Sequence, residues 1–362
     1  MKIVIFAGGS GRRLWPISLK SSPKQFEPII GSRSTLQLAV DRVKDTYGAE
    51  NIFISTNEMY IPIIQKQLPE LPVENLIGEP TRRDLAPAVG LAMAHVAQKA
   101  DPAEPVAILW GDNYMTEVPT FLTVLAAAED VLRQGAASIM FVGETARFAN
   151  DNLGWIGLGE PVEGVTDRPV YTFDSFWYRP PMDECQKMYA SGRYVWNTGY
   201  FVTTPGYVRA LYATHQPDMW AKLTGIEAKI GTAGYTEALH DLYPQMETIS
   251  FDDAILTHVP HNQALVLHGN MGWSDPGTLY ALKEAINPDP AANVSKGQVV
   301  THDSKDCLLY NYESDKLVAA VGLEGMIVVN TAESVLVVHK DNIKLVKAMV
   351  DGLVGTDLEK YT

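Results

Sequence analysis

The first 145 residues alternate between short apolar runs and longer stretches in which apolar residues recur at helical spacing. The runs that predict strands are KIVIFA (2–7), NIFIST (51–56), ENLIG (74–78), VAILW (106–110) and SIMFVG (138–143). Between them, residues 34–47 and 86–100 predict amphipathic helices, and Ser34 or Thr35 is suited to cap the first helix. Near-continuous apolar strands that alternate with helices are typical of a parallel sheet covered on both faces, so the pattern predicts an α/β fold.

The pattern loosens over residues 146–205, where glycines and aromatic residues replace regular apolar runs. This composition predicts binding loops and not core. Helical spacing returns at 205–216 and 236–246, and ALVLHG (264–269) predicts one further strand.

The segment PDPAANVSKGQV, which begins at residue 288, is rich in turn-forming residues and predicts a domain boundary. Five short strand-like runs follow it, and residues 340–353 predict a closing helix. We therefore expect an α/β domain over residues 1–287 and a small all-β domain over 288–362.

Composition excludes several functional classes. The chain has 362 residues and a net charge of −14, which argues against nucleic-acid binding because that function needs a basic surface. Cys185 and Cys307 are far apart and belong to no CxxC or Cys/His spacing, so neither a disulfide framework nor a zinc site is expected. No run reaches the roughly 18 apolar residues of a membrane helix, and the apolar run at the N-terminus is too short for a signal peptide. We expect a cytoplasmic protein with no membrane contact.

The stretch FAGGSGRRLWP (6–16) joins a glycine-rich turn to two arginines directly behind the first predicted strand. Leu14 stands where a dinucleotide-binding fingerprint needs a third glycine, and the Gly-Lys-Ser/Thr of a P-loop occurs nowhere in the chain. Residues 1–26 carry five Lys or Arg residues and no carboxylate, so the turn can attract a polyphosphate. The alternative is an ordinary glycine turn with solvated arginines.

The longer stretch GGSGRRLWP…SPKQF resembles the signature G-G-x-G-x-R-L-x-P…P-K of the sugar nucleotidyltransferases. Its tryptophan and PKQF resemble the mannose-1-phosphate guanylyltransferase family in particular. The resemblance implies a mixed, mostly parallel Rossmann-like sheet followed by a small β domain of β-helix type. It also implies that Gly8, Gly9 and Gly11 wrap the nucleotide, while Arg13 and Lys24 hold its triphosphate.

Two aspartates are candidates for the divalent metal that this family's reaction needs. Asp112 follows VAILW, and Asp275 lies in WSDPG beyond ALVLHG, so both lie past the ends of predicted strands. They match the family motifs L-x-x-D and W-S-D-x-G, and their oxygens suit Mg²⁺. The alternative is that each is a turn or helix-capping aspartate.

Residues 78–88, GEPTRRDLAPA, resemble the family segment that lies against the nucleotide base. Arg83 matches the motif arginine, and Asp84 stands where asparagine is common. An aspartate acceptor suits the N1–H and N2–H₂ donors of guanine. Asp84 is also placed to cap a helix that starts at Ala86, and the two roles are compatible.

Three further residues are candidates for binding the sugar. Asn197 in YVWNTGYF matches the family's sugar-contacting asparagine, and Gly154 stands in the loop that faces the hexose. Asp252 matches the acid of a third family motif, in a position to orient the sugar or the loops near it.

The resemblance has clear departures. The family's F-V-E-K-P is FWYRP here, so Tyr178 replaces an acid and Arg179 replaces the lysine that holds the sugar phosphate. Arginine keeps the positive charge but differs in reach and geometry. The L-P-A-D-H motif has become LWGDN, and Arg12 stands at a position that is usually threonine. These changes leave the identity of the sugar open.

We therefore expect transfer of GMP from GTP to mannose 1-phosphate, with Mg²⁺ on Asp112 and Asp275 and with Arg13, Lys24 and Arg179 as the cationic groups. One alternative is the same chemistry with another sugar 1-phosphate, such as a heptose 1-phosphate, or with another nucleotide. A second is a catalytically weak paralogue that senses nucleotide-sugars. The terminal β domain is compatible with a homodimer, and the sequence leaves the oligomeric state open.

Overall fold

The computed structural model describes residues 1–8, 14–19 and 23–362, and their contacts form two compact units. We call the first the sheet unit; it comprises residues 1–8, 39–111 and 115–273. The second, the β unit, comprises the described residues of 9–38 together with 112–114 and 274–362. The predicted division into 1–287 and 288–362 stays a prediction, because these contacts group the chain in space and not along the sequence.

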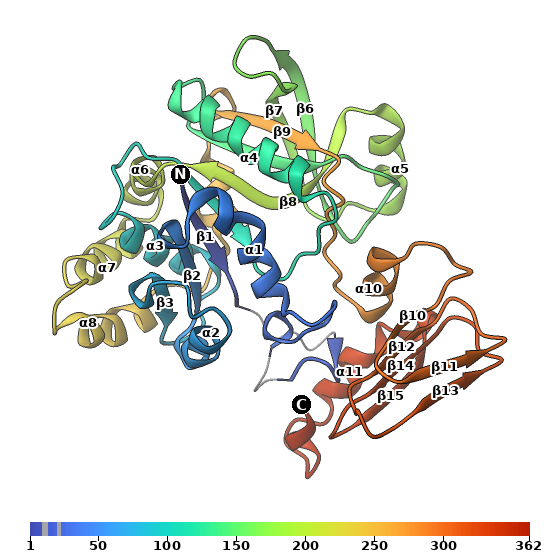
Figure 1. The fold of residues 1–362 in the computed structure, drawn as a ribbon. Helices are drawn as coiled ribbons and strands as arrows, with labels where there is room; N and C mark the ends of the chain where they lie inside the picture. Colours follow the sequence, from blue (N-terminus) through green and yellow to red (C-terminus); the bar gives the residue numbers. More distant parts are fainter. Residues whose placement is uncertain (9–13, 20–22) are drawn as a thin grey trace. The chain divides into compact units, whose positions relative to one another are not determined.

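Nine strands of the described chain form one mixed sheet in the sheet unit, in the order β3-β2-β1-β4-β8-β5-β9-β7-β6 (Figure 1). They are β1 (Lys2–Phe6), β2 (Ile52–Asn57), β3 (Leu76–Glu79), β4 (Val106–Trp110), β5 (Ile139–Glu144), β6 (Gly154–Val162), β7 (Val170–Trp177), β8 (Tyr194–Thr203) and β9 (Ala264–Gly269). Strands β3, β2, β1 and β4 are parallel neighbours, as are β5 and β9, and β8 runs antiparallel to both β4 and β5. The six strands predicted from apolar runs are all present.

Helices cover the sheet. The helices of the sheet unit, together with α1, which begins in the β unit, are α1 (Thr35–Tyr47), α2 (Ile61–Gln67), α3 (Leu85–Val96), α4 (Val118–Arg133), α5 (Met182–Ser191), α6 (Pro205–His215), α7 (Pro217–Glu227), α8 (Tyr235–Leu242) and α9 (Phe251–Ala254). Helix α3 is the centre of a cluster with α6, α7 and α9, while α4 packs on β5, β8 and β9. None of the described helices is long and apolar enough to cross a membrane.

The prediction that residues 146–205 are mainly loops is wrong. Three strands, β6, β7 and β8, and helix α5 lie in this stretch. Trp155 and Trp196 are 0% and 1% exposed and pack edge to face, with 6.4 Å between ring centroids. These strands bury aromatic residues in place of regular aliphatic runs. Register shifts interrupt their alternation, in β8 opposite Val142/Gly143 of β5 and in β6 at Gly157/Leu158.

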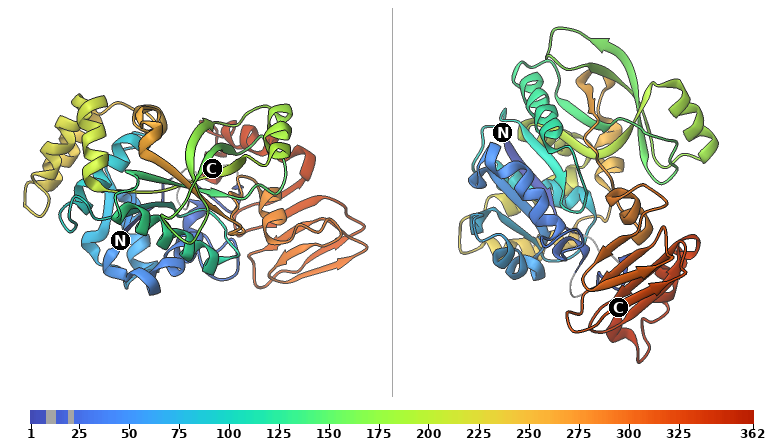
Figure 2. Two further views of the ribbon diagram at one scale, coloured as in Figure 1. Left: turned by 90° about the horizontal axis from the view of Figure 1, so that it is seen from above. Right: turned by 45° about the vertical axis from the view of Figure 1, so that its right-hand side comes forward.

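The β unit contains two small sheets (Figure 2). Its elements are β10 (Val294–Lys296), β11 (Val299–His302), β12 (Leu308–Asn311), β13 (Val318–Val321), β14 (Met326–Asn330), β15 (Val335–His339), α10 (Leu279–Ile286) and α11 (Leu345–Asp351). Strands β10, β12 and β14 are parallel, β11 pairs in parallel with β13, and β15 is antiparallel to β14. Successive parallel strands alternate between the two sheets, which is the arrangement of a β-helix.

The early segment of the chain shares a core with the β-helix strands of this unit. Leu14, Trp15 and Ile29 are buried with Leu308 and Ile327 in one apolar cluster. The indole N–H of Trp15 donates to the backbone carbonyl of Tyr361, with 2.7 Å between the two atoms. Residues Leu14, Trp15 and Ile29 therefore pack with the C-terminal part of the chain, from which they are separated by more than 250 residues.

Candidate active site

Three predicted catalytic residues meet within the β unit. The Lys24 Nζ lies 2.6 Å from Asp112 Oδ2 and 4.0 Å from Asp275 Oδ1. The lysine side chain is 15% exposed and the two carboxylates are 35% and 39% exposed. An ammonium thus stands beside two carboxylates that remain accessible to a ligand, and we call these residues the lysine–aspartate cluster.

Backbone pairing brings the two aspartates to the same place. Tyr114 and Ser274 form an isolated antiparallel bridge, with N–H···O distances of 3.0 and 2.9 Å. Asp112 precedes Tyr114 by two residues, and Asp275 directly follows Ser274. The segments that carry Asp112 and Asp275, which the sequence predicts beyond two different strands, are therefore joined by two backbone hydrogen bonds.

Lys24 begins the 3₁₀ turn η2 (Lys24–Phe26), whose next two residues are buried. The turn is closed by hydrogen bonds from Phe26 N–H to the Pro23 carbonyl (2.9 Å) and from Glu27 N–H to the Lys24 carbonyl (3.2 Å). With Gln25 and Phe26 2% and 3% exposed, the backbone that carries Lys24 has little freedom.

The chemistry of the two carboxylates fits a hard divalent cation. Mg²⁺ in phosphoryl-transfer sites takes one or two carboxylates and completes its coordination with phosphate oxygens and water. Asp112 and Asp275 supply two carboxylates. The ammonium of Lys24, which lies next to both, shows that these carboxylates together stabilise a positive charge. In the described part of the chain, no group of three His, Cys, Asp or Glu side chains could hold a metal.

The sheet unit contains a small apolar cavity of about 40 Å³ with two polar groups, Asn197 and Asp252. Its aromatic walls are Trp110, Phe141, Phe176, Phe201 and Phe251. A cavity of this size accommodates only a few water molecules at most, so it marks where the Asn197 and Asp252 side chains converge and is not by itself a pocket for a sugar.

Asn197 is held by the turn that follows it. Its Oδ1 accepts a hydrogen bond from Gly199 N–H at 2.9 Å, and Gly199 has φ 75°, a conformation that favours glycine. A Cβ at Gly199 would also collide with the Trp110 indole. Gly154 lies opposite Asn197 in the β6–β8 ladder, so both predicted sugar-site residues share one patch.

Asp252 and Asp84 lie near each other at this end of the sheet unit. Burial raises the pKa of Asp252, and the nearby charges of Asp253 and Asp84 raise it further. Asp84 has φ 65°, and its carboxylate accepts the Leu85 N–H at 2.8 Å, which confirms the capping role at α3. An acid with a raised pKa next to a second acid is a natural acceptor and donor for ligand hydroxyls.

The structure places the remaining predicted residues in several ways. Arg83 reaches Thr248 with an Nη1–Oγ1 distance of 3.4 Å. Gly8 follows β1, where an added Cβ would meet no atom within 4 Å. The predictions for Gly9, Gly11 and Arg13 lie outside the described residues.

Arg179 lies two residues beyond the end of β7, in the sheet unit. It has φ 47°, and its guanidinium lies 5.3 Å from the centre of the Tyr178 ring. Tyr178 is 76% exposed, so the departure FWYRP presents an aromatic ring and a cation to solvent.

Glu144 and Arg147 were not among the predicted site residues. Arg147 Nη1 lies 2.5 Å from the fully buried Glu144 carboxylate, and Arg147 Nη2 donates to the Trp273 carbonyl at 2.9 Å. The guanidinium also lies 4.8 Å from the centre of the Trp196 ring. Arg147 therefore contacts both Trp196, which precedes Asn197, and Trp273, which lies two residues before Asp275.

Glu144 itself is strongly affected by its surroundings. Burial raises its pKa to about 7, against the opposing effects of the Met271 N–H and Arg147. The pair gave no sequence signal, because a glutamate at a strand end and an arginine three residues later match none of the motifs. Only the fold reveals that the carboxylate is buried.

Two known protein families match consecutive parts of the chain. A family described as nucleotidyl transferase matches residues 2–291, and the MannoseP isomerase/GMP-like β-helix domain matches residues 297–353. A Salmonella typhimurium protein named mannose-1-phosphate guanylyltransferase is 30% identical, covering 99% of this chain and 73% of the relative. An Escherichia coli protein of the same name is also 30% identical, covering 99% and 75%.

The fold has a close counterpart among crystal structures. A Thermus thermophilus protein described as a mannose-1-phosphate geranyltransferase matches with a TM-score of 0.85 and 26% identity, over 97% of this chain and 98% of that one. The predicted α/β nucleotidyltransferase fold with a small C-terminal β domain is confirmed. From these matches along nearly its whole length, the chain belongs to the mannose-1-phosphate guanylyltransferase family and is a sugar-1-phosphate nucleotidyltransferase.

Proposed function

We propose that this protein transfers GMP from GTP to α-D-mannose 1-phosphate, giving GDP-mannose and pyrophosphate. The observation that carries the proposal is the lysine–aspartate cluster, in which Lys24 meets Asp112 and Asp275. These residues belong to three separate motifs of the family, and relatives at 30% identity bear the name of this activity.

The nucleotide phosphates are assigned to the lysine–aspartate cluster. Asp112 and Asp275 would hold Mg²⁺, which when bound neutralises charge on phosphate oxygens. Lys24 lies within reach of the same oxygens and would bind the β- and γ-phosphates together with Arg13. The Lys24–Asp112 ion pair keeps the ammonium in place before substrate arrives.

The sugar is assigned to the patch of the sheet unit that contains Asn197, Gly154 and Asp252. Asn197 and Asp252 offer an amide and a carboxyl group to sugar hydroxyls. Arg179 would bind the phosphate of the incoming sugar, since its guanidinium can form two parallel hydrogen bonds with a phosphate. Asp84 would accept the N–H groups of guanine with the carboxylate oxygen that does not cap α3.

The transfer itself needs positioning and charge neutralisation. A phosphate oxygen of the sugar 1-phosphate attacks the α-phosphorus, the bond between that phosphorus and the bridging oxygen breaks, and pyrophosphate leaves with the bonding electrons. The attacking oxygen is already an anion, so no strong general base is required.

The same chemistry on another sugar 1-phosphate is the second candidate, because Tyr178 and Arg179 replace the family's Glu-Lys pair and Trp110, in the altered motif LWGDN, lines the cavity beside Asn197. The experiment is pyrophosphate release with Mg²⁺ for GTP, ATP, UTP and dTTP. Each is paired with mannose, glucose and heptose 1-phosphates, and the Asp112→Asn variant is the blank. Release with GTP and mannose 1-phosphate alone is the expected result. Release with a different pair would replace the assignment of the substrates. If folded protein binds GDP-mannose but releases no pyrophosphate with any pair, the result would favour a nucleotide-sugar sensor.

A further inference from the structure

The β unit holds two of the three segments of the lysine–aspartate cluster through charged side chains that the reaction does not use. Lys296, on β10, reaches the segment that carries Lys24. Asp306, in the loop before β12, reaches helix α10, which follows Asp275. Both contacts lie within the β unit.

Lys296 fastens the turn that follows η2. Its ammonium donates to the carbonyls of Pro28 and, at 3.0 Å, Gly31. The same ammonium lies 4.9 Å from the centre of the Tyr312 ring, and the face of an aromatic ring stabilises a cation. Pro28 is only four residues beyond Lys24, and the neighbouring Ile29 is 2% exposed.

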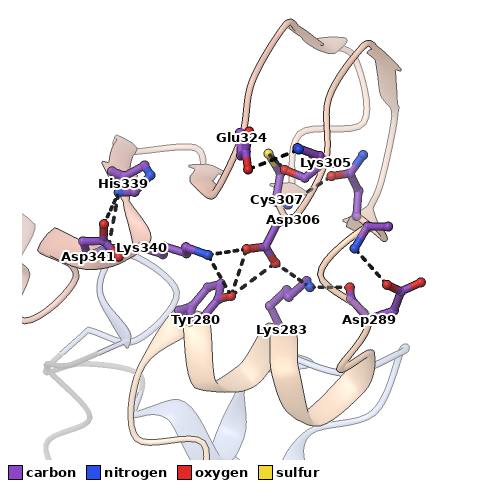
Figure 3. Close-up of polar contacts among 12 residues, drawn as sticks. Tyr280, Lys283, Asp289, Lys305, Asp306, Cys307, Glu324, His339, Lys340 and Asp341 are labelled. Carbon is purple, nitrogen blue, oxygen red and sulfur yellow. Dashed lines mark hydrogen bonds and ion pairs between the residues drawn. The ribbon is translucent and has the colours of Figure 1, made fainter.

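Asp306 is the centre of a buried network (Figure 3). The Lys283 Nζ lies 2.6 Å from Asp306 Oδ1, and Lys340 Nζ lies 2.6 Å from Asp306 Oδ2. The Tyr280 hydroxyl donates to the same carboxylate at 2.9 Å, and Lys283 also donates to the Asp289 carbonyl at 2.8 Å. Lys283 is 1% exposed and Asp306 3%, so two charges are almost removed from water.

This network anchors helix α10, which begins four residues after Asp275. Tyr280 and Lys283 lie on α10, whose first turn is capped by the Thr278 hydroxyl, which accepts the Ala281 N–H at 3.2 Å. Only Pro276 and Gly277 separate Thr278 from Asp275, and the Gly277 N–H donates to the Asp275 carbonyl at 2.8 Å. A rigid α10 therefore limits where the Asp275 carboxylate can lie.

Burial of a charged pair is a weak source of stability, because apolar residues of similar size often serve as well or better. A charged pair instead fixes the orientation of the segments that carry it, since its hydrogen bonds form only in one geometry. We propose that Lys296 and Asp306 are positioning residues for nucleotidyl transfer, with Lys296 acting through Lys24 and Asp306 through Asp275. The inference rests on the proposed function of the lysine–aspartate cluster.

The test is a pair of double-mutant cycles in the full-length protein. The single variants are Lys296→Met and Asp306→Asn, combined with Lys24→Met and Asp275→Asn respectively. Lys305 and Glu324 form an exposed ion pair on the same β unit, so Lys305→Met and Glu324→Gln are matched controls. Initial rates are measured with the most active substrate pair, and melting temperatures are recorded for every variant.

Displacement of a reacting group by about 1 Å can cost on the order of 100-fold in rate. We expect Lys296→Met and Asp306→Asn each to lower kcat by about 10- to 100-fold at saturating substrate, with the controls unchanged. In protein that already carries Lys24→Met, the added Lys296→Met change should lower kcat by less than about twofold. In protein that already carries Asp275→Asn, the added Asp306→Asn change should likewise lower kcat by less than about twofold. Full additivity in both cycles would overturn the proposal, because it would mean that Lys296 does not act through Lys24 and Asp306 does not act through Asp275.

Two further measurements keep the test decisive. Lys340→Met leaves the Lys283–Asp306 pair intact, and it replaces Asp306→Asn if that variant does not fold. The same double-mutant cycles can be measured without turnover, from the binding of Mn²⁺ and of GTP by calorimetry. If the wild-type protein releases no pyrophosphate with any substrate pair, the proposed function fails. The positioning inference then stands or falls on whether Asp306→Asn weakens Mn²⁺ binding only while Asp275 is present.

Discussion

At the scale of single residues, the lysine–aspartate cluster is the feature on which catalysis should depend most. Removing one preorganised electrostatic group typically costs about 10²- to 10³-fold in rate. We expect Asp112→Asn and Asp275→Asn each to lower kcat by at least that factor, since either change removes a carboxylate next to Lys24. Pyrophosphate release measures the loss. Asp303→Asn, on an 84% exposed side chain, is the control, and a near-wild-type rate in either variant would refute the metal assignment.

Arg179 allows a separate test of the most visible departure from the family. Its side chain lies at an exposed position beyond β7, so changes there should not disturb the core. Arg179→Lys restores the family residue and keeps the charge, and we expect it to retain kcat within about tenfold. Arg179→Met should raise the KM for the sugar 1-phosphate and lower kcat/KM by about 10²-fold, the usual cost of one charged phosphate contact. Equal activity of the Met variant and the wild type would remove Arg179 from the site.

Sequence motifs predicted the composition of the site more completely than its geometry. They identified Lys24, Asp112 and Asp275 separately, and the fold adds that Lys24 pairs with both acids. They missed Glu144 and Arg147, because the importance of this pair depends on burial and on the distant Trp273 carbonyl. Chemistry that depends on spacing along the chain can be read from a sequence, whereas chemistry that depends on desolvation cannot.

At the scale of elements, the apolar runs predicted the central strands because those strands are buried on both faces. Strands β1, β2, β4, β5 and β9 each consist mostly of buried residues. The strands within 146–205 were not predicted for a physical reason: they use tryptophan, tyrosine and glycine, and register shifts interrupt their alternation. Ser34, by contrast, was predicted as a cap and does accept the Gln37 N–H, at 3.2 Å, at the start of α1.

Helix α10 gives a stability prediction through Asp306. Burial opposes ionisation of this carboxyl, but hydrogen bonds from Lys283, Lys340 and Tyr280 outweigh burial and hold its pKa at about 2, below the ordinary value of 3.8. A lowered pKa means that the stabilisation is complete above about pH 4 and is lost as the pH falls through about 2. By linkage, Asp306 should contribute about 2 kcal/mol to the free energy of unfolding at neutral pH.

Chemical denaturation between pH 2 and pH 5 measures this contribution. We expect the unfolding free energy of the wild-type protein to fall by about 2 kcal/mol more than that of Asp306→Asn over this range, because the variant lacks the titrating group. Asp303→Asn again serves as the control, since that carboxylate is exposed. Parallel pH profiles for the wild type and Asp306→Asn would show that the network does not hold Asp306 ionised.

At the scale of the whole molecule, the predicted site residues are divided between the two units. Among the described residues, Lys24, Asp112 and Asp275, which we assign to phosphate and metal binding, belong to the β unit, while Asn197 and Asp252 belong to the sheet unit. The β unit is thus more than an appended domain, because the chain segments that carry Lys24 and Asp275 take part in its packing. A contiguous domain boundary read from sequence does not convey this interleaving.

Ligand binding should therefore stabilise the folded protein in two separable steps. A ligand at a hundred times its Kd raises the unfolding free energy by about 2.7 kcal/mol. We expect GTP with Mg²⁺ to raise the melting temperature of the wild-type protein more than GTP with EDTA does, because the metal adds contacts to Asp112 and Asp275. The increment due to Mg²⁺ should vanish in the Asp112→Asn/Asp275→Asn double variant, while the shift produced by mannose 1-phosphate should persist because Asn197 and Asp252 are unchanged. If the Mg²⁺ increment survives in the double variant, the metal binds elsewhere, and the assignment of the two aspartates is wrong even though the chain remains a nucleotidyltransferase.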